Sequence, residues 1–396
     1  MKRRTLLSTF ALAPWCCLPR LVLAGEDHAA MPMQQGGIAI SATFAPDGSL
    51  WVVGLNEHRR LFVQRSADAG QHWSAPRVLE TGADVIAADG ENRPKLRFGP
   101  NGWAVISYTQ PLSKPYSGEI RMLRSDDGAM TFSAPFTVHQ DRQVITHRFE
   151  SIAFDSSGAL HTLWIDKRDV ERAGDAASYA GAAVYRNVSH DGGKTFGPDI
   201  KVADHSCECC RIALVDDGSG GLAAMWRHVF DEHIRDHAFA TLARGSGESS
   251  RIVRCSFDDW RIDACPHHGP GLAAAASGGF HAVWFGVRDE EPAVRYARLD
   301  ARGNPAADVR VIPDPGAEHA DVCSVGDNVV IVWRSFDGQR TRYSAWISRD
   351  DGKTFDQQLL GQTDAQADNP LLVRRNNEVF ALWRAGADIH AVRVLA

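Results

Sequence analysis

Short apolar runs recur along the chain and are separated by turn residues. Runs such as residues 152–154, 212–214 and 371–373 precede a turn containing Gly, Asp or Asn, and an alternating run such as residues 61–63 or 183–185 follows. Between the turn and the alternating run lies a bulky ring in six units, with Gly54 in its place in the first: Tyr108, Trp164, Trp226, Trp284, Trp333 and Trp383. Short strands at regular spacing predict an all-β array.

The rings and Gly54 together mark seven units. The last unit ends at Ala396 after three runs, so we expect a strand from residues 28–40 to complete it. Pairing the two ends of the chain in one sheet would cover edges that otherwise stay open. The pattern therefore predicts seven units of four strands, or six if the first or last unit is degenerate.

A short turn pattern, Ser-x-Asp-x-Gly-x-Thr-Trp/Phe, occurs four times. It occupies residues 66–73, 125–132, 189–196 and 348–355, and only His72 and Ala129 depart from it. Ser and Asp side chains accept hydrogen bonds from turn amides, and Gly supplies a positive φ. The pattern resembles the Asp-box of sialidases and related β-propellers. This resemblance implies four-stranded blades in which the box joins the two outer strands, far from any catalytic centre.

The N-terminal residues resemble an export signal. Arg3 and Arg4 precede an apolar run over residues 6–12, and Ala24 precedes a plausible cleavage point at Gly25. The apolar run is too short to span a membrane as a helix. We therefore expect residues 1–24 to be a Tat-like signal peptide, residues 25–396 to form one propeller domain, and the protein to be periplasmic or secreted.

Composition narrows the range of partners. The 396 residues are 44% hydrophobic and carry a formal charge of -6. Such a chain can bury a large core and has no general affinity for polyanions, so a nucleic-acid partner is not expected. The sequence gives no basis for an oligomeric state.

Reactive side chains gather where a propeller would bring them to one rim. In a blade, the start of the inner strand lies beside the end of the second strand. Polar residues at those positions form a candidate anion or substrate rim, consisting of Arg93, Arg148, Glu150, Arg211, Arg227, Arg334 and Arg384. Neighbouring guanidinium groups could hold a carboxylate, for instance of a glycan, or could instead cap strands and pair with protein carboxylates.

Cysteine and histidine are concentrated at the same rim. Residues 205–211 hold three thiols and an imidazole, and both side chains are ligands for copper and zinc. The candidate metal ligands are His147, His267, His268, His319, Cys207, Cys209 and Cys210. We expect a transition-metal site, with copper as the first ion and zinc as the alternative.

Disulfides are the competing interpretation of the cysteines. Six of the eight cysteines lie beyond residue 200, and an exported chain meets an oxidising compartment. Cys255 and Cys265 bracket a loop around Trp260, and Cys323 could reach the 207–210 stretch. The Cys-x-Cys-Cys stretch together with residues 259–270 also resembles a group of exported Asp-box proteins, a resemblance that implies no activity. Both interpretations remain open at this point.

Sialidase activity is the natural first hypothesis from the Asp-boxes, and it implies three substrate-binding arginines, a Tyr nucleophile assisted by Glu, and an Asp acid/base. Sialidases carry an Arg-Ile-Pro motif ahead of the first Asp-box, but no such motif precedes Ser66 here. None of the six tyrosines lies near the start of an inner strand in the last units, where the nucleophile would be expected. The sequence therefore assigns no catalytic residue. The predictions are a metal-binding propeller, an exo-sialidase or other glycan hydrolase, or a protein- or glycan-binding propeller with disulfides only.

Overall fold

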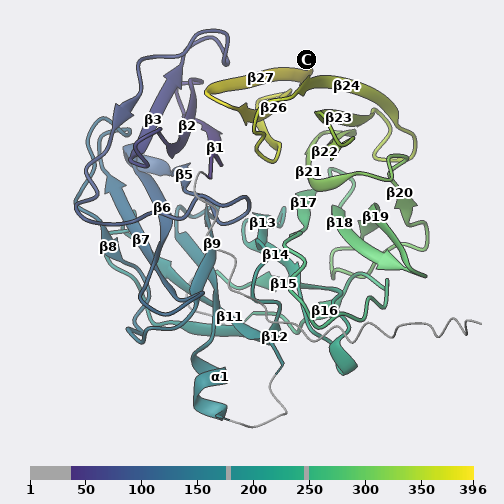
Figure 1. Ribbon diagram of the computed structural model, residues 1–396, viewed down its shortest axis with the longest axis horizontal. Helices are drawn as coiled ribbons and strands as arrows, with labels where there is room; N and C mark the ends of the chain where they lie inside the picture. Colours follow the sequence, from purple (N-terminus) through teal and green to yellow (C-terminus); the bar gives the residue numbers. More distant parts are fainter. Residues whose placement is uncertain (1–36, 175–179, 245–248) are drawn as a thin grey trace, which may run out of the picture. The chain divides into compact units, whose positions relative to one another are not determined.

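The structure is a computed structural model that describes residues 37–174, 180–244 and 249–396. Within these residues, seven antiparallel sheets follow one another along the chain and form a seven-bladed β-propeller (Figure 1). Each sheet is built from consecutive strands, so the chain completes one blade before it starts the next. The all-β prediction with seven blades is confirmed, and the alternative of six is wrong.

The first three blades each contain four strands. They comprise β1 (Ser41–Phe44), β2 (Leu50–Leu55), β3 (Leu61–Ser66) and β4 (Arg77–Val78); β5 (Lys95–Phe98), β6 (Ala104–Pro111), β7 (Gly118–Ser125) and β8 (Phe136–Thr137); and β9 (His147–Phe154), β10 (Leu160–Asp166), β11 (Ala182–Ser189) and β12 (Ile200–Ser206). The helical turn η1 (Pro100–Gly102) lies in the second blade, and helix α1 (Arg168–Ala173) follows β10 in the third.

The other four blades continue this order. They comprise β13 (Ala213–Asp216), β14 (Leu222–Arg227), β15 (His237–Leu242) and β16 (Val253–Arg254); β17 (Gly271–Ala274), β18 (Phe280–Arg288), β19 (Glu291–Leu299) and β20 (Arg310–Val311); β21 (Glu318–Val325), β22 (Asn328–Phe336), β23 (Thr341–Ser348) and β24 (Asp356–Thr363); and β25 (Leu371–Arg375), β26 (Glu378–Ala385) and β27 (Asp388–Leu395). The helical turn η2 (Asp231–His233) lies between β14 and β15.

The bulky rings found in the sequence belong to the second strand of each blade. Both faces of such a strand pack against a neighbouring blade, so β10 and β14 are buried along their whole length. Trp164, Trp226 and Trp333 are almost completely buried there. In the first blade a Cβ at Gly54 would lie 2.8 Å from a side-chain carbon of Ile40, which explains why no ring stands at that position.

The ring of blades closes between β26 and β2. Arg384 donates from Nη1 to the carbonyl oxygen of Leu55 at 2.7 Å, and the backbone N of Ile40 donates to Asp368 Oδ2 at 2.9 Å. Residues 37–40 form no strand, and the seventh sheet has three strands within the described part of the chain. The remainder of the predicted closing strand, residues 28–36, lies outside the described residues.

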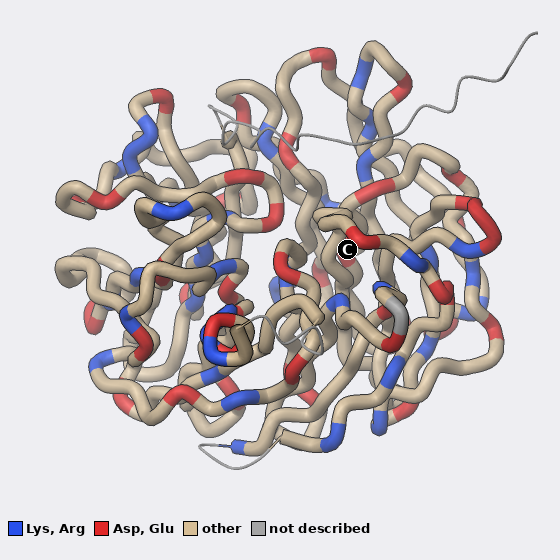
Figure 2. The backbone as a smooth tube through the Cα atoms, turned by 60° about the horizontal axis from the view of Figure 1, so that its bottom comes forward, with Lys and Arg blue, Asp and Glu red and all other residues tan. Residues whose placement is uncertain are grey.

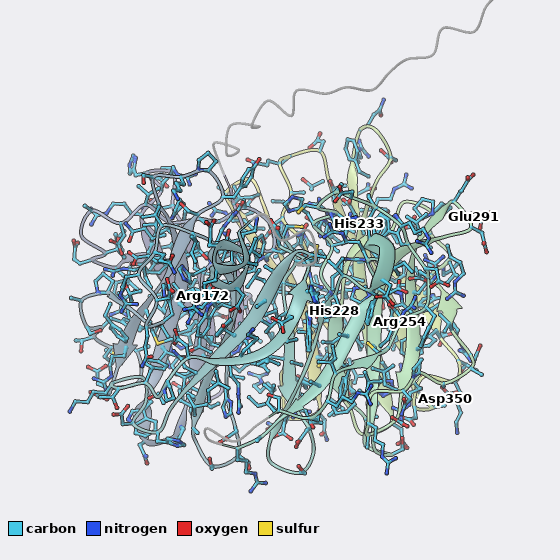
Figure 3. All side chains as sticks on the ribbon, turned by 90° about the horizontal axis from the view of Figure 1, so that it is seen from below. Arg172, His228, His233, Arg254, Glu291 and Asp350 are labelled. Carbon is cyan, nitrogen blue, oxygen red and sulfur yellow. The ribbon has the colours of Figure 1, made fainter. Side chains whose placement is uncertain are left out.

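The four Asp-boxes form the turns between the third and fourth strands of their blades. In the third blade Ser189 Oγ accepts a hydrogen bond from the backbone N of Gly193 at 2.8 Å, and Asp191 Oδ1 accepts one from Thr195 N at 2.8 Å. Figure 3 shows Asp350 of the last box at one end of the blades and His233 and Glu291 at the other. The boxes are thus separated from the face where second strands end.

Charged residues of both signs are interspersed over the molecule (Figure 2). The described residues contain no helix that is long and apolar enough to cross a membrane. The predicted signal peptide, residues 1–24, lies outside the described residues.

Candidate metal centre

The mouth of the propeller channel is crossed by the loop between β4 and β5, which reaches the middle of the ring (Figure 1). Glu91 of this loop contacts Arg211 in the fourth blade, Gly269 before the fifth and His319 in the sixth. Side chains from distant parts of the sequence therefore meet at this face, where inner strands begin and second strands end.

Glu91 is the centre of a buried hydrogen-bond network. Its carboxylate accepts hydrogen bonds from Arg211 N at 3.1 Å, Arg211 Nη1 at 2.9 Å, Gly269 N at 2.8 Å and His319 Nδ1 at 3.3 Å. Burial alone would raise the pKa of the Glu91 carboxyl, but Arg211 and His319 hold it well below its usual range. Glu91 is therefore an anion that fixes three blades in place.

The rim arginines connect blades to one another. Arg93 pairs with Asp368 at 2.9 Å, and Arg227 donates to the carbonyl oxygens of His268 and Phe285 at 2.9 and 2.7 Å. The remaining rim residues also have protein partners: Arg148 with Asp89 at 3.7 Å, Arg211 with Glu91, Arg334 with Glu318 and the Ala367 carbonyl, Arg384 with the Leu55 carbonyl, and Glu150 with Lys95. Each of these guanidinium groups thus has a protein oxygen atom within 3.7 Å.

A pocket of about 190 Å³ lies inside the channel beneath the Glu91 loop. Its walls carry Lys95, Arg97 and Asp321 beside Ser151. Burial lowers the pKa of Lys95, although Glu150 opposes this change. The pocket is therefore polar and has both charge signs.

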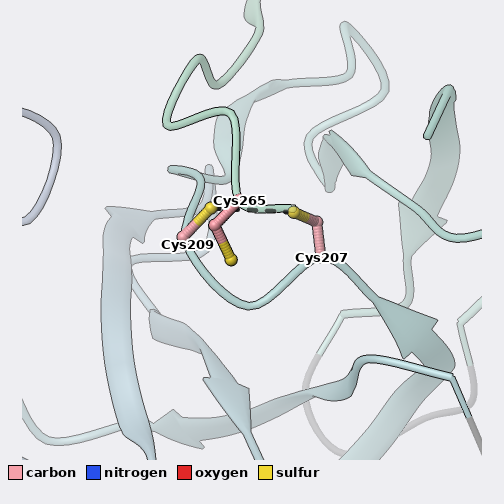
Figure 4. A group of neighbouring side chains, drawn as sticks. All are labelled: Cys207, Cys209 and Cys265. Atoms are coloured by element: carbon pink, nitrogen blue, oxygen red, sulfur yellow. Dashed lines mark hydrogen bonds between the residues drawn. The ribbon is translucent and has the colours of Figure 1, made fainter. Parts of the chain in front are cut away.

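Four cysteine thiols form a cluster beside the mouth. The Sγ–Sγ distances are 3.7 Å from Cys207 to Cys209, 3.8 Å from Cys209 to Cys210 and 4.0 Å from Cys210 to Cys207. The Sγ atom of Cys265 lies within 4.8 Å of those of Cys207 and Cys209 (Figure 4). We call these four residues the thiol cluster. It joins the β12–β13 connection to the β16–β17 connection.

The three distances within the Cys207–Cys209–Cys210 triangle match the edges of a tetrahedral metal site, and Cys265 lies near two of its corners, Cys207 and Cys209. Zinc binds thiolate at about 2.3 Å, and a tetrahedron of that radius has edges of about 3.8 Å. Cys207, Cys209 and Cys210 are buried, whereas Cys265 is exposed, so the cluster has a solvent-facing side. Three thiols are thus already at the mutual distances of ligands that share one ion.

Within the thiol cluster, only the surroundings of Cys207 favour negative charge, since the pKa values of the other three thiols are raised. Hydrogen bonds with Cys209, Cys210 and Cys265 lower the pKa of Cys207, and Arg235 lowers it further. Arg235 Nη1 donates to Cys207 Sγ at 3.3 Å. The pKa of Cys209 is raised, first through its hydrogen bond with Cys207. The Arg235 guanidinium group therefore stabilises a thiolate at Cys207, the form in which cysteine binds metals.

A second group contains two imidazoles and a carboxylate. One ligand atom each of His268, Glu318 and His319 lies within 4.8 Å of the other two. The His268 ring stacks on Phe285 with centroids 4.2 Å apart and on His319 at 4.5 Å. Burial lowers the pKa of His268 to about 3, and His319 contributes to the decrease. His268 is therefore neutral at neutral pH, as a metal ligand must be.

Two of the predicted histidine ligands lie apart from these groups. His147 is buried in the third blade, where its ring stacks on His139 at 4.0 Å and its Nδ1 lies 3.1 Å from the Gly118 carbonyl oxygen. His267 is exposed and adjoins His268 in sequence, but it belongs to neither group of possible ligands in the described chain.

The cysteines expected to form bridges also separate. Cys255 is buried and donates from Sγ to the His237 carbonyl oxygen at 3.3 Å, while Cys265 joins the thiol cluster. Cys323 packs against the apolar cluster between the sixth and seventh blades. Every cysteine that the structure describes is a free thiol. Disulfide pairing therefore stays a prediction.

Three residues of this face were missed by the sequence analysis, namely Glu91, Arg235 and Glu318. Glu318 directly precedes His319, and Glu91 lies two positions before Arg93, both of which the sequence predicts at the rim. Their position beside those residues was the available signal. Nothing in the sequence around Arg235 indicates a contact with a thiol.

Comparison with known proteins supports the fold. No protein-family model matches the chain, and no curated protein matches it in sequence. An ulvan lyase of polysaccharide lyase family 25, solved with a bound saccharide, is similar in structure, with 12% identity, a TM-score of 0.60 and coverage of 91% of this chain and 93% of that one. A Hadza microbial sialidase has 13% identity, a TM-score of 0.51 and coverage of 85% and 73%.

A third similar structure is the α-L-arabinanase of Penicillium chrysogenum in complex with arabinobiose. Its identity is 14%, its TM-score 0.51, and the match covers 80% of this chain and 94% of that one. At this identity the likeness concerns the fold. The chain has a β-propeller fold similar to that of the sialidase and of the other two glycan-processing enzymes.

Proposed function

We propose that this sialidase-like propeller is an exported metal-binding protein that holds one zinc ion through Cys207, Cys209, Cys210 and Cys265. The observation that carries the proposal is the sulfur triangle of Cys207, Cys209 and Cys210 with edges of 3.7, 3.8 and 4.0 Å, together with the Cys265 sulfur within 4.8 Å of those of Cys207 and Cys209. Thiolate ligands of one ion lie at such distances from one another. A site with four protein ligands is closed, so the metal has a structural role.

Zinc is the ion that a tetrahedral set of four sulfurs favours. Copper(I) is the other ion that thiolates select, and fewer than four of the thiolates would coordinate it at one time. Arg235 lies next to the thiol cluster and would balance part of the negative charge of a tetrathiolate complex. We therefore place zinc first and copper(I) second.

The metal would stabilise the shape of the channel mouth. The thiol cluster bridges the connections that lead into β13 and β17, and Arg211 and Gly269 of those connections both bind Glu91. Binding of an ion to the native state alone stabilises that state by mass action. Loss of the ion should therefore loosen the contacts of Glu91.

A glycan ligand at the mouth is the second candidate function, and the observation in its favour is that similar propellers were solved with saccharides bound. Exo-sialidase chemistry is less well supported, because the rim arginines bind protein oxygen atoms. Tyr343 is buried and donates to the Asp368 carbonyl oxygen at 2.9 Å, which leaves it unsuited as a nucleophile. Hydrolysis of a fluorogenic sialoside that is lost in Arg334→Ala would restore that hypothesis.

The experiment that tests zinc binding is elemental analysis of the full chain purified under reducing conditions. The wild type should carry zinc, and Cys207→Ser/Cys209→Ser should lose the thiol-bound equivalent. Cys323→Ser is the matched control, because it removes a thiol outside the cluster. A thiol count on denatured, non-reduced protein distinguishes ligands from disulfides. Bridged Cys207, Cys209 and Cys210 would overturn the proposal.

A further inference from the structure

The mouth carries a second possible metal site that shares no ligand with the thiol cluster. We infer that His268, Glu318 and His319 bind a divalent cation such as Zn²⁺ and leave a coordination position open to water or an anionic ligand. The three ligand atoms lie within 4.8 Å of one another. Two imidazoles and one carboxylate are a ligand set that zinc uses where a further position stays open.

The ring of His319 is oriented by two carboxylates. Its Nδ1 lies 3.3 Å from Glu91 Oε1, and its Nε2 lies 3.9 Å from Glu318 Oε2. A carboxylate that accepts the Nδ1–H bond fixes the tautomer in which Nε2 carries the lone pair. Glu91 is therefore a positioning residue that turns the free nitrogen of His319 toward Glu318.

The two carboxylate oxygens of Glu318 have different neighbours. Arg334 Nε donates to Oε1 at 2.8 Å, and Arg334 Nη1 is itself held by the Ala367 carbonyl oxygen at 3.1 Å. This leaves Oε2 directed at the His319 ring. A carboxylate with one oxygen fixed by a neighbour and the other facing an imidazole nitrogen has the arrangement of an oriented ligand.

His268 has a ring nitrogen without a hydrogen-bond partner. Nδ1 of His268 is buried and has no hydrogen-bond partner. Burying a polar atom without a partner costs free energy, and a bound ion would remove that cost. Stacking on Phe285 and His319 holds the ring in place. His268 is therefore fixed beside the other two ligands without a competing partner at this atom.

The backbone at His319 has a strained conformation of the kind found at ligand-binding sites. Its φ is 50°, a left-handed value that is costly for a residue with a side chain, and the β21–β22 register shifts between Glu318 and Asp321. Such strained positions persist where the surrounding structure over-determines them, and they cluster at ligand-binding sites. The irregularity turns His319 out of the strand alternation and toward His268.

The test is a cobalt(II) titration of metal-free, reduced full-length protein. Cobalt in the thiol cluster gives an intense thiolate-to-cobalt charge-transfer band, whereas cobalt bound by two imidazoles and a carboxylate gives only weak visible bands. We expect the wild type to bind two equivalents with both signatures. His268→Gln/His319→Gln should lose one equivalent and keep the charge-transfer band.

Two further variants separate this inference from the proposed function. Cys207→Ser/Cys209→Ser should lose the charge-transfer band and keep the weak bands, and His267→Gln should keep both because that imidazole lies outside the group. Glu91→Gln should weaken the second equivalent by about 10- to 100-fold, as loss of an orienting carboxylate does. An unchanged second equivalent in His268→Gln/His319→Gln, or a wild type without the weak bands, would overturn the inference.

Discussion

Glu91 and Arg211 lie 120 positions apart in the chain, and the Glu91 carboxylate accepts hydrogen bonds from both the backbone N and Nη1 of Arg211, at 3.1 and 2.9 Å. The side chain of Glu91 is only 3% exposed. This pair connects the β4–β5 loop, which lies between the first and second blades, to the fourth blade beside the thiol cluster. The stability of the mouth should depend on it.

We expect Glu91→Ala to lower the free energy of unfolding by about 3 to 5 kcal/mol, because it leaves the Arg211 guanidinium without its buried partner. Glu80→Ala is the control, since the Glu80–Arg60 pair at 2.8 Å is solvent-exposed and should contribute less than about 1 kcal/mol. Urea denaturation of both variants measures the difference. Equal effects would mean that Glu91 does not stabilise the fold.

Gly269 is a position where the backbone of one connection approaches another. A Cβ there would lie 2.3 Å from Arg211 Cγ and 2.8 Å from the Arg211 backbone N and O. Gly269→Ala should therefore destabilise the protein by about 1 to 3 kcal/mol and weaken zinc binding, because it displaces the segment that carries Cys265. Thermal melts with and without zinc measure both effects.

Gly197→Ala is the matched control for that substitution. Its nearest contact, the Val188 carbonyl oxygen, would lie at 3.5 Å, an ordinary van der Waals distance. We expect this variant to change stability by no more than about 0.5 kcal/mol. A Gly269→Ala protein as stable as Gly197→Ala would contradict the close approach at the mouth.

The Asp-boxes should affect stability without affecting metal binding. Ser189 Oγ accepts a hydrogen bond from Gly193 N at 2.8 Å and donates to Asp191 Oδ1 at 2.8 Å. Ser189→Ala leaves the buried amide without a partner and should cost about 1 to 3 kcal/mol. Chemical denaturation and zinc content are the measurements. Loss of zinc at unchanged stability would show that the boxes belong to the metal site.

Acid should destabilise the third blade through His139. Its Nδ1 lies 2.6 Å from the Asp141 carbonyl oxygen and its Nε2 accepts a hydrogen bond from Ile120 N at 3.1 Å, so the neutral ring uses both nitrogens. Burial, followed by His147, lowers the pKa of His139 to about 2. The unfolded state takes up this proton near pH 6.5, whereas the folded state does not.

Stability contributed by neutral His139 is therefore fully present above the unfolded pKa and is lost as the pH falls from there toward the folded pKa. The expected loss is about 1.4 kcal/mol per pH unit. In His139→Gln the amide can keep the bond from Ile120 but takes up no proton, so unfolding between about pH 7 and pH 5 should depend less steeply on pH. Identical pH dependence in both proteins would contradict this account.

The sequence was sufficient for the architecture because its signals are local. Rings such as Trp226 and Trp284 and the Asp-box turns are set by their own neighbours in the chain, so the blades could be counted. The position of Glu91 depends on the path of a loop that crosses the channel mouth, and local pattern carries no information about such a path.

The direction of its side chain explains why His147 lies apart from both groups of possible metal ligands. The β9–β10 register shifts between Leu163 and Ile165, opposite Phe149 with a φ of 55°. One extra residue reverses which face of a strand a side chain occupies. His147 lies before this bulge and is therefore directed at His139 inside the blade, a reversal that alternation of apolar and polar residues does not reveal.

Zinc K-edge X-ray absorption of the His268→Gln/His319→Gln protein reports the ligands of the thiol cluster alone, because the second possible site has lost its imidazoles. We expect a single shell of four sulfur atoms at about 2.3 Å. A shell of nitrogen or oxygen atoms at about 2.0 Å, or a protein that takes up no zinc after reduction, would contradict this expectation.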